Sequence, residues 1–387
     1  MKEWKVVKLG ELYEVHNGLS KSGKFFGSGF PFLTFSTVFN NYFLPKELTD
    51  FVESTEKERE SYSIHRGDVF VTRTSETSNE LGMSCVALKD YPNATYNGFT
   101  KRMRPVTDRV LPEYIGYYMR MPSFRGEFQA FSTMTTRASL RNEDLLSLEI
   151  RLPDLEEQQA IADVLSTYDS LISNNQKQIK LLEEAAQRLY KEWFINLCFP
   201  GHEDVEIVDG VPNGWKICPI DEVFDIHYGK TLPTSKIGKE GRYPVYGANG
   251  VIGYYKTHNC DDYVTLITSR GNGSGNVLRT YDKESFVTNN SFVVVPKANK
   301  LQLPYVHQCM KNIDFRAIRT GSAQPQLTNN SISTIKIILP NEELIKVFDG
   351  TCIQYYKYIN QLMKKSELLT EARDRLLPKL MSGEIDL

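Results

Sequence analysis

The stretch from Asp154 to Phe194 contains neither glycine nor proline and repeats apolar residues in a heptad-like pattern. The recurring positions alternate in spacing between four and three residues: Ile161, Leu165, Tyr168, Ile172, Asn175, Ile179, Leu182, Ala186, Leu189 and Trp193. Such spacing is typical of a helix that packs lengthwise against another helix. At about 1.5 Å per residue the helix spans on the order of 50–60 Å, too long for the core of one small domain. The sequence therefore predicts a long helix with a partner, and Asn175 is a polar seam residue of the kind that sets register.

The predicted partner runs from Asn341 to about Met381 near the other end of the chain. Its seam is Leu344, Phe348, Thr351, Tyr355, Tyr358, Leu362, Lys365, Leu369, Ala372 and Leu376. Both stretches follow a Leu-Pro pair, Leu152-Pro153 or Leu339-Pro340, and both open with acidic residues, which favour a helix N-terminus. Two unrelated amphipathic helices would show the same periodicity, but the matching boundaries favour a pair. We expect an antiparallel coiled coil.

The beginnings of the two halves also repeat. Trp4-Lys5-Val6 returns as Trp215-Lys216-Ile217, and the segment 11–18 returns at 222–229 with the same offset. Runs such as 68–72, 84–88, 263–268 and 291–295 read as strands, and 112–121 and 304–311 read as helices that begin at proline. We therefore expect an α+β chain with a pseudo-twofold internal repeat, in which two globular α/β bodies are separated by the two long helices. The expected boundaries are 1–153 for the first body, 154–196 for the first helix, 197–214 for a linker, 215–340 for the second body and 341–387 for the second helix and tail.

Composition limits the class of protein without identifying it. Six cysteines lie scattered with no C-x-x-C pair, which argues against a disulfide framework or a zinc site and fits a reducing cytoplasm. No apolar run approaches the roughly 18 residues that cross a membrane, and the N-terminal segment lacks the pattern of a secretory signal. The formal net charge of −2 does not by itself suggest a nucleic-acid partner. Because the acidic excess lies on the two helical stretches, any DNA contact has to come from local basic patches on the bodies.

Motifs that carry chemistry are missing. The glycine cluster 271–275 lacks the Lys-Ser/Thr that completes a phosphate-binding loop, and Ser274 is not centred in a nucleophile elbow. There is no H-E-x-x-H, no Asn-Pro-Pro-aromatic stretch of an amino-methyltransferase, and no lysine after Pro153-Asp154 to complete a nuclease centre. His16 and His227 occupy equivalent places in the repeat and are expected to be structural. We predict no catalytic residue, no metal site and no bound cofactor in this chain.

Basic, amide and hydroxyl residues instead gather on predicted loops of both bodies. For any one of them a solvated turn is an equally good interpretation, but as patches repeated in two bodies they favour DNA contact, since Arg reads guanine, Asn and Gln read adenine, and Ser, Thr and Lys hold phosphates. The candidates in the first body are Arg73, Thr74, Ser75, Lys101, Arg102, Arg104, Thr136, Arg137 and Arg141. Those in the second body are Ser269, Arg270, Asn272, Asn276, Arg279, Asn290, Gln324 and Gln326.

With these residues in view, the chain resembles the specificity subunit of type I restriction-modification systems over essentially its whole length. The segments that carry the resemblance are Trp4 to Leu12, Gly67 to Glu76, Leu152 to Ala162, Arg188 to Phe194, Pro212 to Trp215, and Leu377 to Ile385. One departure is the start of the second long helix, Asn341-Glu342-Glu343-Leu344-Ile345, which lacks the family's usual Glu-Gln pair.

The resemblance implies a non-catalytic subunit with two target-recognition domains and two conserved helices. Each domain would read one half of a bipartite double-stranded DNA target. The helices would set the spacer and bind two methyltransferase subunits, which methylate adenine N6 with S-adenosylmethionine. Restriction subunits that translocate DNA with ATP and Mg²⁺ would join the same complex. All cofactors would then lie in partner subunits. The complex would be cytoplasmic and would not bind a membrane.

Two other functions stay open on the residues alone. The chain would be an enzyme with unrecognised motifs if it showed nuclease or methyltransferase activity without a partner. It would be a coiled-coil scaffold with two bodies that bind something other than DNA if the assembled complex showed no salt-dependent DNA binding.

Overall fold

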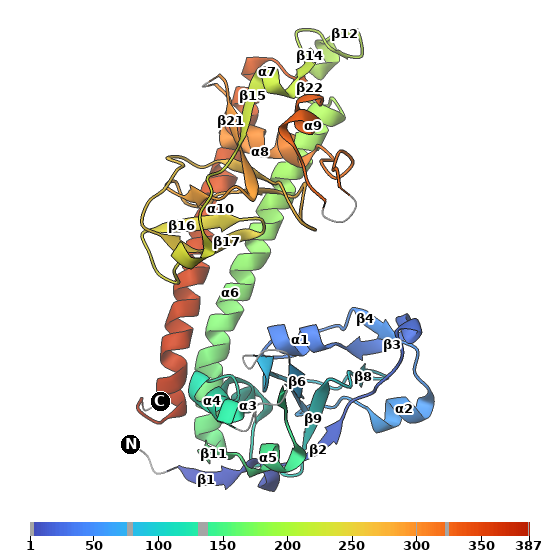
Figure 1. The fold of residues 1–387 in the computed structure, drawn as a ribbon, viewed down its shortest axis with the longest axis vertical. Helices are drawn as coiled ribbons and strands as arrows, with labels where there is room; N and C mark the ends of the chain where they lie inside the picture. Colours follow the sequence, from blue (N-terminus) through green and yellow to red (C-terminus); the bar gives the residue numbers. More distant parts are fainter. Residues whose placement is uncertain (1–3, 76–79, 131–137, 299, 322–324, 386) are drawn as a thin grey trace. The chain divides into compact units, whose positions relative to one another are not determined.

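The computed structural model describes residues 4–75, 80–130, 138–298, 300–321, 325–385 and 387 (Figure 1). The chain divides into two compact units, one formed by residues 1–172 with 368–387 and the other by residues 173–367. Each unit therefore contains one globular body together with part of both long helices. The predicted division into separate body and helix domains stays a prediction, because the contacts group each body with its adjoining helix segments.

The two long helices are α6 (Leu155–Tyr190), which continues into a π-helical turn at Lys191–Ile195, and α10 (Glu342–Met381). Both begin in the same way. The Asp154 carboxylate accepts a hydrogen bond from the Glu157 N–H at 2.9 Å, and the Asn341 side chain accepts one from the Leu344 N–H at 2.8 Å. A side-chain oxygen placed there satisfies one of the free N–H groups of the first helical turn. The Leu-Pro-acidic boundary in the sequence thus marked both helix starts correctly.

The first unit contains two larger sheets. One is four-stranded, in the order β2-β9-β5-β7, and fully antiparallel; the other is three-stranded, in the order β4-β3-β8, with β3 and β8 parallel. Two short pairs, β1-β11 and β10-β6, complete the strands of this unit in the described part of the chain. The strand bounds are β1 Lys5–Lys8, β2 Tyr13–Asn17, β3 Phe26–Leu33, β4 Asp50–Val52, β5 Val69–Thr72, β6 Thr74–Ser75, β7 Ser84–Val86, β8 Thr95–Tyr96, β9 Thr100–Pro105, β10 Ala138–Ser139 and β11 Glu149–Leu152. The helices of the body are α1 Phe35–Asn40, α2 Glu56–Ser61, α3 Pro112–Tyr118, α4 Pro122–Ala130 and α5 Asn142–Ser147.

The second unit repeats this plan. Its four-stranded antiparallel sheet has the order β15-β21-β18-β19, its three-stranded sheet has the order β17-β16-β20 with β16 and β20 parallel, and β14 pairs with β22. A further hairpin, β12-β13, lies in the predicted linker. The strand bounds are β12 Ile207–Val208, β13 Val211–Pro212, β14 Lys216–Pro219, β15 Phe224–Tyr228, β16 Tyr243–Gly247, β17 Gly250–Tyr255, β18 Thr265–Thr268, β19 Val277–Arg279, β20 Phe286–Val287, β21 Ser291–Pro296 and β22 Lys336–Leu339. The helices are α7 Ile220–Val223, α8 Leu303–Lys311 and α9 Asn329–Ser333.

The matching strand orders confirm the predicted α+β fold and its internal repeat. Gly18 and Gly229 show how close the correspondence is, since each follows the first strand of its four-stranded sheet. A Cβ on Gly18 would lie 2.1 Å from the Asn97 carbonyl oxygen, and one on Gly229 would lie 2.4 Å from the carbonyl oxygens of Val287 and Thr288. Both positions require glycine because another backbone segment occupies the space of a side chain.

In each unit the body packs its core against the long helices. The first unit buries Ile161 and Leu165 of α6 and Leu377 and Leu380 of α10 in one cluster with the residues of α3 and α4. The second unit buries Ala186 and Tyr190 of α6 and Phe348, Cys352 and Tyr356 of α10 in one cluster with those of α8. These helix segments are therefore part of the cores and not merely connections between them.

Contacts between α6 and α10 are antiparallel within each unit. In the first, the Arg373 guanidinium is 2.5 Å from the Asp169 carboxylate. In the second, Asn175 Nδ2 donates to Ser366 Oγ at 3.2 Å, and the rings of Tyr190 and Phe348 lie 6.0 Å apart. Partner numbers along α10 fall as residue numbers along α6 rise, so the antiparallel helix pair is confirmed.

The predicted seam of α6 fits this pairing, but that of α10 is displaced by one residue in its middle. The predicted α6 seam residues are buried or partly buried, and Asn175 is 2% exposed. On α10 the predicted Thr351, Tyr358 and Lys365 are exposed, Tyr358 by 46%, whereas the next residues, Cys352, Ile359 and Ser366, face inward. The exposed Tyr358 hydroxyl donates a hydrogen bond of 3.1 Å to Gln178 of α6. The α10 pattern is ambiguous because this helix buries side chains against the body as well as against α6.

Among the described residues, no helix combines the length and the apolar composition that a membrane span requires.

Candidate nucleic-acid interface

The predicted contact residues are organised around two equivalent turns, one in each half. In the first half Arg73 follows β5; its N–H donates to the Phe99 carbonyl at 3.0 Å and its carbonyl accepts from the Leu140 N–H at 3.0 Å. In the second half Ser269 follows β18; its N–H donates to the Asn290 carbonyl at 2.9 Å and its carbonyl accepts from the Leu327 N–H at 2.8 Å. The same two backbone hydrogen bonds thus bring together three segments that lie far apart in each half of the sequence.

We define the first-half cluster as Asn17, Arg73, Phe99, Lys101 and Asn142. The Asn17 side-chain oxygen accepts from Arg73 Nη1 at 3.2 Å and from Lys101 Nζ at 3.4 Å. Lys101 also donates to the Asn142 side chain at the start of α5. Burial, and after it the charge of Arg73, lowers the pKa of Lys101. Lys101 is only 5% exposed, which corrects its prediction as a direct DNA contact, so the partly exposed Arg73 is the cation of this pair that a phosphate can reach.

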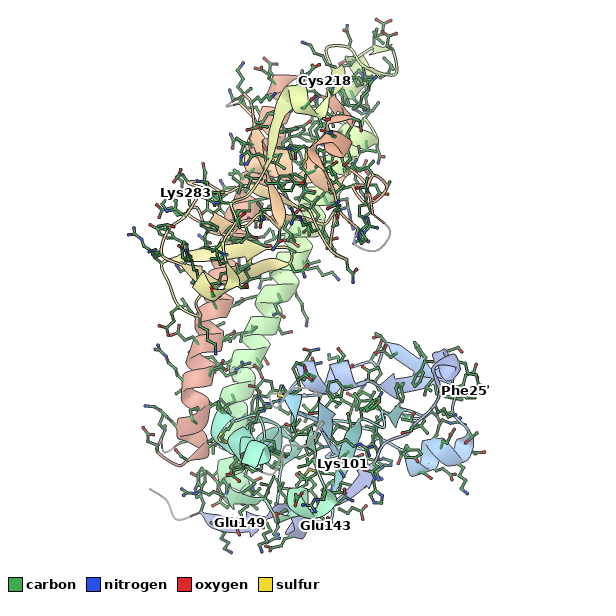
Figure 2. The ribbon with its side chains drawn as sticks, in the orientation of Figure 1. Phe25, Lys101, Glu143, Glu149, Cys218 and Lys283 are labelled. Carbon is green, nitrogen blue, oxygen red and sulfur yellow. The ribbon has the colours of Figure 1, made fainter. Side chains whose placement is uncertain are left out.

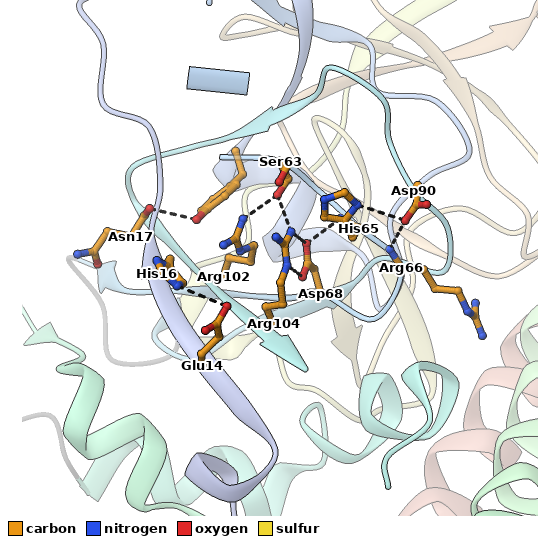
Figure 3. Close-up of polar contacts among 11 residues, drawn as sticks. Glu14, His16, Asn17, Ser63, His65, Arg66, Asp68, Asp90, Arg102 and Arg104 are labelled. Carbon is orange, nitrogen blue, oxygen red and sulfur yellow. Dashed lines mark hydrogen bonds and ion pairs between the residues drawn. The ribbon is translucent and has the colours of Figure 1, made fainter. Parts of the chain in front are cut away.

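Arg102 and Arg104 do not belong to this cluster; Arg102 is 3% exposed, which corrects its prediction as a direct DNA contact, whereas contact by Arg104 stays a prediction. Figure 3 shows their guanidinium groups directed toward Ser63, whose carbonyl accepts from Arg102 Nη1 at 2.9 Å and from Arg104 Nη2 at 3.0 Å. Arg104 also makes a two-point ion pair with the buried Asp68, at 2.8 and 2.7 Å, and this hydrogen bonding raises the pKa of Arg104. The reason is the pleat of β9: alternate residues point to opposite faces, so adjacent basic residues cannot share one surface. Figure 2 labels Lys101, the member of this run that remains in the cluster.

We define the second-half cluster as Arg270, Asn272, Asn290, Arg316 and Gln326, five exposed side chains around the Ser269 turn. Arg270 and Gln326 form an isolated β-bridge, and the Gly271 N–H donates to the Pro325 carbonyl at 3.0 Å. Arg316 donates to the Asn276 side chain at 2.8 Å, which ties the glycine loop to the segment after α8. Gly275 requires its residue type, because its φ is +86° and a Cβ would lie 3.1 Å from the Arg316 nitrogen. The glycine cluster therefore builds a compact turn that presents polar side chains.

Two residues predicted in the second half are buried. Arg279 is 3% exposed; its Nη1 donates to Asn360 of α10 at 2.9 Å, and its guanidinium lies over the rings of Tyr281 and Tyr356. Ser269 is fully buried, and its hydroxyl donates to the Asn289 carbonyl at 3.2 Å. The predictions of direct DNA contact by Arg279 and Ser269 are corrected for this reason: one packs against the long helix and the other holds the turn.

The remaining candidates divide by location. Arg141 is exposed and pairs with Asp144 at 3.0 Å. Thr74 and Ser75 form β6, which pairs with Ser139 and Ala138. Thr136, Arg137 and Gln324 lie outside the described residues.

The sequence did not single out Asn17, Phe99, Asn142 or Arg316. Asn17 stands opposite Lys101 in the β2-β9 ladder, and at the matching place in the β15-β21 ladder Tyr228 stands opposite Phe292, with ring centroids 4.2 Å apart. The repeat itself was the signal that could have found Asn17 and Phe99, since their counterparts sit beside the same turn. The two halves therefore share the same backbone arrangement, and the side chains at equivalent positions differ in chemistry.

Neither cluster combines a nucleophile with a base. In the described parts of the chain, no group of three or more His, Cys, Asp and Glu side chains is arranged to hold a metal ion. The chemistry that these surfaces offer is recognition by hydrogen bonds, charge and apolar contact.

Comparison with known proteins gives a consistent family. The family model described as the type I restriction modification DNA specificity domain matches residues 1–184 and 212–368. The specificity subunit of the type I restriction enzyme MjaIX of Methanocaldococcus jannaschii is 25% identical over 413 residues, which cover 99% of this chain and 94% of that protein. The HindI specificity subunit of Haemophilus influenzae is 23% identical over 482 residues, covering all of both chains.

A solved structure supports the fold. The crystal structure of the type I restriction-modification S subunit from M. genitalium superposes with a TM-score of 0.58 at 19% identity, and the match covers 97% of this chain and 96% of that one. The resemblance noted in the sequence is confirmed, because the family model covers most of both halves. The chain belongs to the type I restriction modification DNA specificity family.

Proposed function

We propose that this chain is the DNA-reading subunit of a type I restriction-modification complex and that it performs no catalysis itself. Each body reads one half of a bipartite target through the cluster at its Arg73 or Ser269 turn. The observation that carries this proposal is the pair of equivalent backbone hydrogen bonds that hold these turns, with different side chains around each. Equivalent backbone turns with dissimilar side chains suit two bodies that recognise different DNA sequences. The two half-sites then differ, so the target is asymmetric.

The long helices serve as the spacer between the two half-sites. Both α6 and α10 contribute residues to both units, so the number of helical residues limits how far apart the readers can act. Major-groove sites on one face of B-DNA recur about every 34–36 Å. A helix of 36 residues measures about 54 Å at 1.5 Å per residue, which is long enough to leave unread base pairs between two readers.

The partners follow from this role. Two methyltransferase subunits bind the helical segments and methylate adenine N6 with S-adenosylmethionine. Restriction subunits that use ATP and Mg²⁺ add to the same complex. The catalytic groups and cofactors then belong to the partners, and the complex acts on cytoplasmic double-stranded DNA.

The test is to express this chain with the methyltransferase subunit encoded beside it, in cells that lack other adenine methylation, and to map N6-methyladenine across the genome. We expect methylation at one asymmetric motif of two short specific parts separated by unread bases. A matched culture that carries the methyltransferase subunit alone should show no such motif. Methylation without sequence preference, or modification by this chain in the absence of its partner, would contradict the proposal.

A further inference from the structure

Phe99 is the large apolar member of the first-half cluster, and its side chain is left in solvent. It is 59% exposed, more than any other phenylalanine in the described part of the chain, and the next, Phe26 and Phe51, are 40% exposed. Burial of a phenylalanine side chain is favourable, so exposure of most of a ring leaves much of this stabilisation unused in the free protein. A contact that covers the ring would recover it.

The backbone holds Phe99 in place. Its N–H donates to the Asn97 side-chain oxygen at 2.7 Å, and its carbonyl accepts from the Arg73 N–H at 3.0 Å. The next residue, Thr100, donates to the Asn97 carbonyl from its N–H at 3.0 Å and from its hydroxyl at 2.7 Å. A Cβ at Gly98 would lie 2.3 Å from Ser20 Oγ, so the turn has little room to rearrange. The ring is thus presented from a fixed turn and not from a loose loop.

The Phe99 backbone is hydrogen-bonded to the backbone of Arg73, a cationic member of the cluster. Arg73, which bonds to the Phe99 carbonyl, shares the Asn17 oxygen with Lys101. Cations of this kind contact phosphates and fix the position of a protein on a duplex, whereas base edges are read by side chains placed between them. An exposed apolar ring close in the fold to the partly exposed Arg73 suits contact with a base while the arginine contacts a phosphate.

The repeat indicates what such a side chain does. Asn290 occupies the position of Phe99 in the second half, because its carbonyl accepts from the Ser269 N–H as that of Phe99 accepts from Arg73. Asn290 is also exposed. In the major groove an asparagine reads adenine through N6 and N7, and a phenylalanine makes apolar contact with the 5-methyl group of thymine. The same turn thus carries a phenylalanine in the first half and an asparagine in the second.

We propose that Phe99 is a specificity-determining residue that contacts the 5-methyl group of a thymine in the half-site read by the first body. This inference rests on the proposed function. Asn290 takes the corresponding place in the other half-site. Phe99 then contributes to the difference between the two parts of the target.

The probe is the target duplex with each thymine of the half-sites replaced, one at a time, by 2′-deoxyuridine, which lacks only the methyl group. Binding is measured with this chain assembled with its methyltransferase subunit. We expect one replacement in the first half-site to weaken wild-type binding about three- to fivefold, the effect of about one buried methyl group. Phe99→Ala should bind the unmodified duplex more weakly and should lose sensitivity to that replacement. Phe99→Leu should retain part of it.

Val106→Ala is the matched control, because Val106 is 58% exposed in the same unit and lies outside the cluster. This variant should keep the wild-type response to deoxyuridine. Equal sensitivity of wild type and Phe99→Ala at every thymine, or a first half-site that contains no thymine, would overturn the assignment of Phe99. Absence of sequence-specific binding by the assembled wild-type complex would overturn the proposed function as well, so the two failures are distinguishable.

Discussion

Asn175 of α6 and Ser366 of α10 face each other across the helix pair, with the amide nitrogen of Asn175 3.2 Å from the serine hydroxyl oxygen. The Ser366 hydroxyl also donates to the Leu362 carbonyl at 2.9 Å, so the pair is tied to the α10 backbone. A polar pair within an apolar seam disfavours other registers and lowers stability in return. We therefore expect Asn175→Leu to raise the free energy of unfolding by about 1 kcal/mol. Chemical denaturation of the purified chain measures this change.

The neighbouring Asn174 is exposed and supplies the control. Asn174→Leu should change the free energy of unfolding by less than about 0.5 kcal/mol. A loss of stability in Asn175→Leu larger than that in Asn174→Leu would mean that the Asn175–Ser366 hydrogen bond stabilises the pair more than an apolar contact does.

The ion pair of Asp169 and Arg373 ties both long helices to the first body. Asp169 also accepts a hydrogen bond from the Tyr117 hydroxyl at 2.6 Å, and the Arg373 side chain is only 14% exposed. Removing one partner leaves a poorly solvated charge, so Arg373→Ala should lower the free energy of unfolding by about 2–3 kcal/mol. The double variant with Asp169→Asn should lose less than the sum of the single changes, because the two side chains interact. Arg375→Ala, which breaks an exposed pair with Glu371, should cost under about 0.5 kcal/mol.

The stability of the second unit depends on pH through the carboxyl group of Asp349. This α10 carboxylate accepts from the Gln302 N–H at 3.2 Å and from the Tyr305 N–H at 2.8 Å, at the start of α8, and burial raises its pKa to about 6. The folded state then binds the proton more tightly than the unfolded state does. The contribution of this group to stability increases as the pH falls through 6 toward 4, and the charged form costs stability above pH 6.

Urea unfolding at pH 5 and pH 7.5 tests this for wild type and Asp349→Asn. The stability of wild type relative to the variant should be greater at pH 5 than at pH 7.5, by about 1–1.5 kcal/mol. The comparison is needed because burial lowers the pKa of His307, which reduces stability as the pH falls and affects both proteins equally. A difference between the two proteins that does not change with pH would contradict the assignment.

Gly18 and Gly350 should respond oppositely to alanine. A Cβ at Gly18 meets the Asn97 carbonyl oxygen at 2.1 Å, which is impossible without displacing the turn that carries Phe99, so Gly18→Ala should lose about 2 kcal/mol or more. Gly350 lies inside α10 and is exposed, with nothing within 4 Å of its Cβ position. Gly350→Ala should therefore gain about 0.5–1 kcal/mol, because alanine favours the helix. Thermal unfolding of both variants decides the matter, and equal effects would contradict this account of the Gly18 packing.

Much of the frame was predictable from the sequence, because it depends on periodicity and repetition. The α6 seam, the two helix starts and the internal repeat could all be found this way. The α10 seam was displaced by one residue because Cys352 and Tyr356 bury against the second body, a surface that no local pattern reveals. Such a helix has two apolar faces, and heptad spacing alone does not show which of them packs against α6.

The candidate contacts were harder to predict, because they depend on which way a side chain points. Lys101, Arg102 and Arg104 look alike in the sequence, yet the pleat of β9 sends the two arginines to Ser63 and Asp68. Arg279 was expected at DNA and packs instead on Tyr356 of α10. Phe99 was overlooked because composition rules favour basic and amide residues, whereas its significance comes from its place beside Arg73.

A paired heptad deletion tests most directly whether α6 and α10 hold two different DNA-reading bodies at a set spacing. Removing residues 171–177 from α6 and the facing residues 364–370 from α10 takes out the Asn175–Ser366 pair and leaves the core residues of both units. Seven residues shorten a helix by about 10 Å, close to three base pairs of B-DNA. Mapping N6-methyladenine for the complex that contains this variant should show the same two half-sites with fewer unread bases between them. Unchanged spacing between intact half-sites would contradict the claim.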